Sequence, residues 1–353
     1  MNKHIIQLSE YRTTIMGIAI LLVMLYHYNF SGIGILFSKG YIGVDFFMFL
    51  SGLGLCYSMN KNDDTATFYK KRVFRILPVY IPLAILLGIL CKEDNLYMAL
   101  WRCTTLGFWT NQIYTEWYVP SILLLYALFP LLFKYIIKPG KIKLLSFFIV
   151  GISLLSLILA IYPQTDWQHF CLIYRIPIFL LGAMCTIIGD DKTYNSVKTG
   201  IILSGLSGLL IYVFGGGTLR IAWVSVMLMS PVILAGICHL LEMIHINKTE
   251  VATHKIRLTS AQGTVKRING GGNPLTHNPL TRIKTNIIKF INRLGVCTLE
   301  LYMIHVILWR LTILQPYWEK HHNITATVCI IMSIQLSFLF HDTIAYIINK
   351  KRS

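Results

Sequence analysis

Four ionisable side chains stand where the surrounding sequence is apolar enough to enter a membrane. His27 lies near the end of MGIAILLVMLYHYNF and Asp45 follows the glycines of GYIGVDFF, while Glu116 is in TEWYVPS and Arg175 begins RIPIFLLG. Ionised groups at membrane depth are costly and usually have a function and a partner. A histidine beside a carboxylate can act as a general base whose partner orients the imidazole.

A second group of charges lies at the start of a later apolar segment. FYKKRVFRILP contains Lys70, Lys71, Arg72 and Arg75. Arg72 and Arg75 are three residues apart and therefore share a helix face. Guanidinium groups match the geometry of phosphate, so this cluster predicts a phosphate site. For Lys70 and Lys71 the alternative is that they anchor the helix at the inner membrane surface.

The elements that must position these residues are membrane-spanning helices. Of the 353 residues, 55% are hydrophobic and only 13% are charged, whereas soluble domains are about one quarter charged. Apolar runs of membrane-spanning length recur throughout the chain. We therefore predict an all-α, polytopic bundle forming a single domain over residues 1–353. The ten predicted spans are 14–30, 41–60, 73–91, 117–137, 144–162, 171–189, 200–215, 219–245, 294–315 and 324–348.

The distribution of basic residues predicts the orientation. Lysine and arginine gather in alternate connections, as at Lys61–Arg72 and Lys134–Lys143, whereas residues 163–170 contain none. Basic connections stay cytoplasmic, so both termini are expected there. The net charge of +17 then reflects topology, and we predict no nucleic-acid partner. With the spans placed this way, the depths of His27, Asp45, Glu116 and Arg175 put them in one layer near the outer surface.

Residues 247–293 differ from the rest of the chain. This stretch is polar, is rich in glycine near its middle and carries nine lysines or arginines. We predict a basic, partly disordered cytoplasmic loop. A contact with anionic lipid is one reading and a solvated insertion is the other.

Several kinds of site have no signature in the sequence. HExxH, phosphate-loop, GxSxG and dinucleotide motifs do not occur, and the eight cysteines lack metal-ligand spacing. We predict no metal and no permanently bound cofactor. The histidines at membrane edges are interpreted as solvated; they are His239, His245, His321 and His322.

The order of motifs resembles that of the integral-membrane acyltransferase family 3. The resemblance runs from Arg12 to His305 and rests mainly on GVDFFMFLSG followed by FYKKRVFRILP, with RIPIFLLG and LGVCTLELYMIH after them. It implies transfer of an acyl group, often acetyl from acetyl-CoA, to hydroxyls of surface or lipid-linked glycans in a bacterial inner membrane. The basic cluster would then bind the phosphates of acyl-CoA. His305 matches a recurrent family position, and either catalysis or packing would explain it.

The sequence departs from the family pattern at Met16. The pattern has an arginine eleven residues before the histidine of the first span, which places both on one helix face. Arg12 lies one turn earlier and about 60° from that line. Its long side chain could reach inward and take the place of the missing arginine.

The mechanism expected from these residues uses His27 as the general base. It would deprotonate an acceptor hydroxyl arriving from the outer side, while the thioester arrives from the cytoplasmic side. Asp45 would fix the imidazole tautomer, with a helix-packing hydrogen bond as its alternative role. Arg12, Glu116 and Arg175 would line the site. Two other functions stay open: a transporter or flippase, although no inverted repeat is visible, and a catalytically impaired relative.

Overall fold

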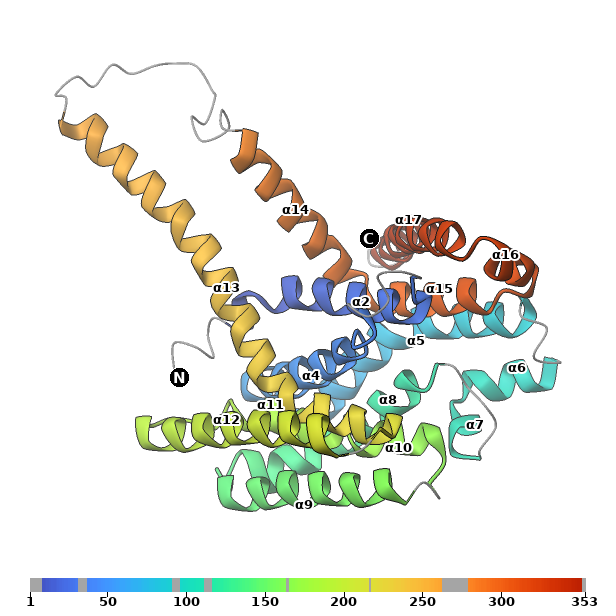
Figure 1. The fold of residues 1–353 in the computed structure, drawn as a ribbon, viewed down its shortest axis with the longest axis horizontal. Helices are drawn as coiled ribbons and strands as arrows, with labels where there is room; N and C mark the ends of the chain where they lie inside the picture. The colour runs from blue at the N-terminus through green and yellow to red at the C-terminus, as the bar shows by residue number, and fades with distance from the viewer. Residues whose placement is uncertain are drawn as a thin grey trace.

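The computed structural model describes residues 8–30, 37–90, 96–110, 116–162, 165–215, 217–261 and 279–350. Every regular element within these ranges is helical (Figure 1), which confirms the all-α class. The first half contains α2 (Arg12–Tyr28), α4 (Ile42–Lys61), α5 (Thr65–Leu90), α6 (Leu96–Cys103), α7 (Leu106–Trp109), α8 (Tyr118–Leu132), the π-helical η1 (Phe133–Ile137) and α9 (Ile142–Ile161). The second half contains α10 (Trp167–Ile173), α11 (Ile176–Met184), α12 (Asp191–Phe214), α13 (Leu219–Ala261), α14 (Pro279–Val296), α15 (Thr298–Arg310), the 3-10 helix η3 (Thr312–Leu314), α16 (Gln315–Lys320) and α17 (His322–Lys350).

Several of these helices have the length and composition of membrane spans. Seven of the described helical segments qualify, and α14 with α15 makes an eighth if the pair, bent by 78°, is one broken span. The protein is therefore a polytopic membrane bundle. The other two of the ten predicted spans correspond to shorter helices: 14–30 is the 17-residue α2, and 171–189 falls on α10 and α11, with 7 and 9 residues.

Helix α4 lies at the centre of the bundle. It is apolar on every side, and 83% of its most apolar stretch is buried. Helices α9 and α12 are at least as apolar, yet only 17% and 6% of their most apolar stretches is buried. A helix that is hydrophobic all round must be covered by protein or by lipid. We conclude that α4 is the core helix and that α9 and α12 face the lipid at the periphery (Figure 1).

Two glycines allow α4 and α11 to pack backbone to backbone. A methyl group on Gly52 would meet the carbonyl of Phe179, and one on Gly182 would meet the carbonyl of Phe49. The contact is reciprocal, so neither glycine can gain a side chain unless the helices separate. Such close approach through small residues is typical of helix pairs in membranes.

The prediction of a loop over residues 247–293 is wrong at both ends. Helix α13 continues to Ala261, and α14 begins at Pro279. Polarity suggested a loop, but residues 247–261 contain no glycine or proline and nothing in them breaks a helix. The glycine-rich middle, 262–278, lies outside the described residues.

Candidate active site

Two histidines from distant parts of the chain form a hydrogen-bonded pair. His27 is in the last turn of α2 and His305 is in α15; Nδ1 of His27 lies 2.8 Å from Nε2 of His305. Nδ1 of His305 lies 2.9 Å from the carbonyl oxygen of Leu301. A carbonyl only accepts, so in the neutral pair His305 carries its hydrogen on Nδ1, and its Nε2 accepts from Nδ1 of His27. This leaves Nε2 of His27 with a free lone pair, the form that a general base requires.

Aromatic and hydroxyl groups hold this pair in place. The Trp309 ring stacks on the imidazole of His27, with centroids 5.2 Å apart and planes 17° apart. The Tyr28 hydroxyl donates to the carbonyl of His305 at 3.3 Å and contacts the Ser333 hydroxyl at 3.2 Å. His305 is fully buried, whereas His27 is half-buried. Of the two, only His27 is placed to meet a substrate.

His322 caps the C-terminal end of α2, at the two residues that follow His27. Its Nε2 lies 2.8 Å from the carbonyl of Tyr28 and 2.9 Å from that of Asn29, which has a φ of 40°. The last carbonyls of a helix lack partners, and a histidine N–H can satisfy them. The interpretation of His322 as a solvated residue is therefore incomplete: the side chain is half-buried, and it also fixes the turn that carries His27.

Asp45 is paired with Arg175 and not with His27. Nε of Arg175 donates to Oδ1 of Asp45 at 3.0 Å, and both side chains are buried. The guanidinium also lies over the rings of Trp117 and Tyr174, 4.8 and 4.2 Å from their centroids. The prediction that Asp45 orients His27 is thus contradicted. His305 holds that place, and Asp45 joins α4 to the N-terminal end of α11, which is its alternative role as a packing residue.

Glu116 also forms a buried ion pair, with Arg102. Nη1 of Arg102 donates to Oε1 of Glu116 at 2.7 Å, with both side chains buried. The Tyr80 hydroxyl donates to the carbonyl of Arg102 at 3.0 Å. Sequence reasoning missed Arg102, although an arginine within LYMALWRC is itself a signal for a buried partner. Asp45, Glu116, Arg102 and Arg175 therefore form two ion pairs that tie helices together.

A cavity next to α4 brings the predicted arginines together. Arg12 and Arg75 line it, and so does Met16. Arg72 lies over the ring of Tyr126, another lining residue, with its guanidinium carbon 5.7 Å from the ring centroid. Nε of Arg12 and Nε of Arg72 are buried without a hydrogen bond, and within the described ranges no carboxylate forms an ion pair with any of the three arginines.

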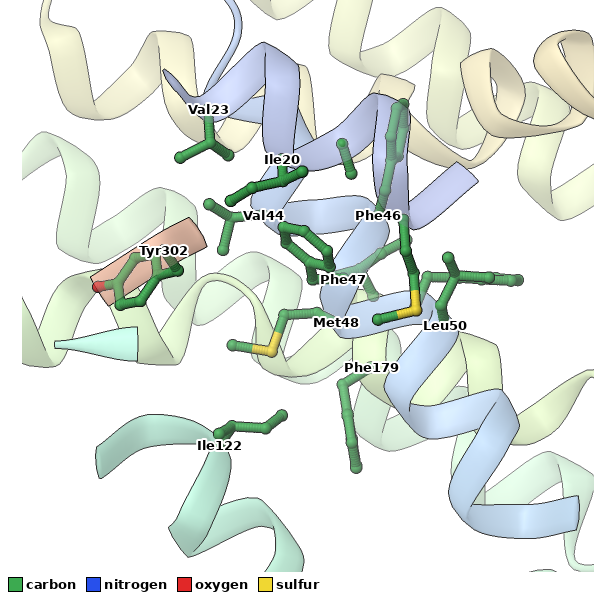
Figure 2. Packing of buried hydrophobic residues seen from close by; sticks show 14 of the residues in the cluster. Ile20, Val23, Val44, Phe46, Phe47, Met48, Leu50, Ile122, Phe179 and Tyr302 are labelled. Atoms are coloured by element: carbon green, nitrogen blue, oxygen red, sulfur yellow. The ribbon is translucent and has the colours of Figure 1, made fainter. Parts of the chain in front are cut away.

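The same cavity extends along α2 toward the histidines. The residues of α2 that line it extend from Arg12 to Val23, which is about 16 Å of helix. Val23 is one turn before His27. Figure 2 shows Val23 together with Val44, Phe47 and Tyr302, which also line the cavity. Its free volume is about 70 Å³. The cavity is therefore narrow, with guanidinium groups at one end, and the histidine pair lies about one helical turn beyond the other end.

Gly54 provides the space for the Arg12 guanidinium. A methyl group at Gly54 would lie 3.1 Å from Nη2, 3.2 Å from Cζ and 3.3 Å from Nε of Arg12. Its role is therefore to admit the arginine side chain. Lys70 and Lys71 are exposed and do not line this cavity.

Arg75 also borders a second cavity of about 220 Å³ between α5, α15 and α17. Glu300 and His341 line its wall, with Oε1 and Nδ1 2.7 Å apart. Sequence reasoning singled out neither residue. This hydrogen bond joins the first turn of α15, the helix of His305, to α17.

Comparison with known proteins identifies the family of the chain. No curated protein and no solved structure matches the chain. A family model described as an acyltransferase domain, that of acyltransferase family 3, matches residues 15–342. This range contains both histidines, Arg72, Arg75 and both buried ion pairs. The chain therefore belongs to acyltransferase family 3 and is a membrane-embedded acyltransferase.

Proposed function

We propose that this acyltransferase moves an acyl group, most simply acetyl, from acyl-CoA to a hydroxyl of a cell-surface or lipid-linked glycan. The observation that carries the proposal is the cavity with unpaired guanidinium groups at one end and a base with a free lone pair beyond the other. The glycan as acceptor rests on the family resemblance alone.

The donor site is assigned to Arg12, Arg72 and Arg75. Three cations near one cavity repel one another, and Arg12 and Arg72 are partly buried without a carboxylate partner among the described residues, which is unfavourable. A multiply charged anion relieves both costs, and CoA carries three phosphate groups. Arg12 reaches the cavity that Met16 lines, which supports its taking the place of the missing family arginine. Because the free volume is small, the acyl arm must displace flexible side chains such as that of Met16.

The chemical step is assigned to the histidine pair. Nε2 of His27 removes the acceptor hydroxyl proton while the oxygen attacks the thioester carbonyl carbon. The C–S bond then breaks, and the CoA thiolate leaves with the proton that His27 returns. Nδ1–H of His27 donates to His305, so His305 stabilises the charge that develops on the imidazole ring. A positioned histidine base typically contributes about 10²–10⁴-fold.

Asp45, Arg175 and Glu116 act as support in this proposal. Their side chains are buried and engaged in ion pairs, and they hold α4, α6 and α11 around the site. Their contribution is to the stability of the bundle and to the position of the cavity walls.

The proposal is tested with purified protein in nanodiscs. Radiolabelled acetyl-CoA is supplied with mixed lipid-linked and soluble glycans, and binding and transfer are measured separately. We expect saturable CoA binding and glycan labelling that requires His27. Binding without transfer would identify a catalytically impaired relative, and the absence of CoA binding would refute the donor assignment.

A further inference from the structure

The C-terminal part of helix α14 packs on the bundle, whereas its N-terminal part projects away from it. Its C-terminal residues pack on α2: Asn292 accepts from the Thr14 hydroxyl at 2.6 Å, and Gly295 contacts the carbonyl of Thr13. Further toward the N-terminus, Ile283 and Ile287 are 54% and 51% exposed. Phe290 is 45% exposed, and its ring packs edge-to-face on Phe338 of α17, with centroids 6.3 Å apart. Figure 1 shows α14 projecting from the helices that it joins.

The exposed residues form an amphipathic pattern. At about 100° per residue, Ile283, Ile287 and Phe290 fall within about 60° of one another. Lys284 lies about 100° to one side of Ile283 and Lys289 about 120° to the other, and both lysines are exposed. An apolar stripe bordered by lysines is typical of a helix lying in a membrane interface.

The bend between α14 and α15 allows α14 to lie in the membrane interface. The two helices meet at 78°, and α15 packs against α5, α17 and α2 within the bundle. With α15 directed along the membrane normal, α14 lies about 12° from the membrane plane. It contacts the N-terminal turns of α2, next to Arg12, which is the end that the basic connections assign to the cytoplasm.

We propose that α14 binds the anionic surface of the inner leaflet. Ile283 and Ile287 enter the acyl boundary together with the part of the Phe290 ring that Phe338 leaves exposed, and Lys284 and Lys289 contact lipid phosphates. Negative lipids of that leaflet attract basic segments near the membrane. The charge of the two lysines favours lipid over a second protein as the occupant. Lipid binding would also fix the junction that holds α2, the helix of His27, against α15, the helix of His305.

The test places a photo-crosslinking amino acid, p-benzoyl-phenylalanine, at Ile287 of the full chain. The matched control places it at Thr285, about 160° around the helix. Vesicles contain phosphatidylcholine alone or with about one third phosphatidylglycerol. We expect lipid adducts at position 287 that increase with phosphatidylglycerol, and few at position 285.

Charge is tested with Lys284→Gln/Lys289→Gln. Two lysines at an anionic surface are worth about 30-fold in partitioning, so the lipid adduct should fall at least about tenfold. The control variant Lys141→Gln/Lys143→Gln removes two lysines elsewhere on the cytoplasmic face of the protein and should leave the yield of lipid adduct unchanged. Adducts to protein instead of lipid, or equal lipid adducts in neutral and anionic vesicles, would overturn the inference. Crosslinking requires no acyl transfer, so this inference and the proposed function can fail separately.

Discussion

Gly54→Ala is a small change that tests whether Arg12 binds the donor. The new methyl group would lie 3.1–3.3 Å from three guanidinium atoms of Arg12, closer than ordinary van der Waals contact. Because the guanidinium ends a flexible side chain, it should move by a few tenths of an ångström while the helices stay in place. Donor binding should therefore weaken with little loss of stability.

The size of the effect follows from the contact that is lost. A hydrogen bond to a charged group is worth about 1.5–3 kcal/mol, so Arg12→Ala should raise the Kd for acetyl-CoA about 10- to 150-fold. Gly54→Ala displaces the group without removing it and should raise Kd by less, up to about tenfold. Isothermal titration calorimetry of protein in nanodiscs measures both values.

Two other glycines serve as matched controls. A methyl group at Gly151, on the lipid-facing α9, would have nothing within 4 Å of it, so Gly151→Ala should change neither Kd nor Tm. Gly52→Ala meets the α11 backbone and should lower Tm strongly. These variants separate a general effect of an added methyl group from displacement of Arg12.

A double-mutant cycle decides the outcome. If Gly54 acts through Arg12, Gly54→Ala should cost nothing further once Arg12 is alanine. Met16→Arg in the Arg12→Ala background should recover part of the binding, since Met16 lines the same cavity. Additive effects of Gly54→Ala and Arg12→Ala, or an unchanged Kd in Arg12→Ala, would refute the reasoning.

The remaining predictions concern the histidine pair and the ion pair of Asp45. His27→Ala should lower kcat by at least about 10²-fold with unchanged CoA affinity, because the base is lost; near wild-type transfer would remove His27 from the mechanism. His305→Ala should lower kcat by a smaller factor, because the imidazole of His27 remains without its orienting partner, and an equal loss in both variants would instead make the pair a single unit. Asp45→Asn leaves the charge of Arg175 buried and uncompensated, so it should destabilise the fold by about 3–5 kcal/mol and lower Tm. A fall in kcat at unchanged Tm would instead indicate that Asp45 takes part in catalysis.

Some of the site could be predicted because it depends on position along single helices. Apolar length identified the spans, and the rise per residue placed the arginines at one end and His27 toward the other. The partner of Asp45 could not be predicted in this way, because it depends on the packing of several helices. Asp45 and His27 were matched by depth, yet rotation about α4 directs Val44 and Phe47 to the cavity and Asp45 to Arg175. Neighbouring residues on a helix point about 100° apart, so depth alone cannot decide which partner is reached.

The position of Arg12 also limits what this arginine can do in the reaction. An arginine at 12 instead of 16 lies about 6 Å farther from His27 along the helix axis, near the end of the cavity away from the histidine pair. At that distance a guanidinium can hold a phosphate but cannot contact the thioester carbonyl beside His27. Loss of Arg12 should therefore raise KM for acyl-CoA and leave kcat at saturating donor nearly unchanged. An Arg12→Ala enzyme with an unchanged KM and a reduced kcat would place the arginine at the reacting carbonyl, and α2 would then have to bend or unwind between Arg12 and His27.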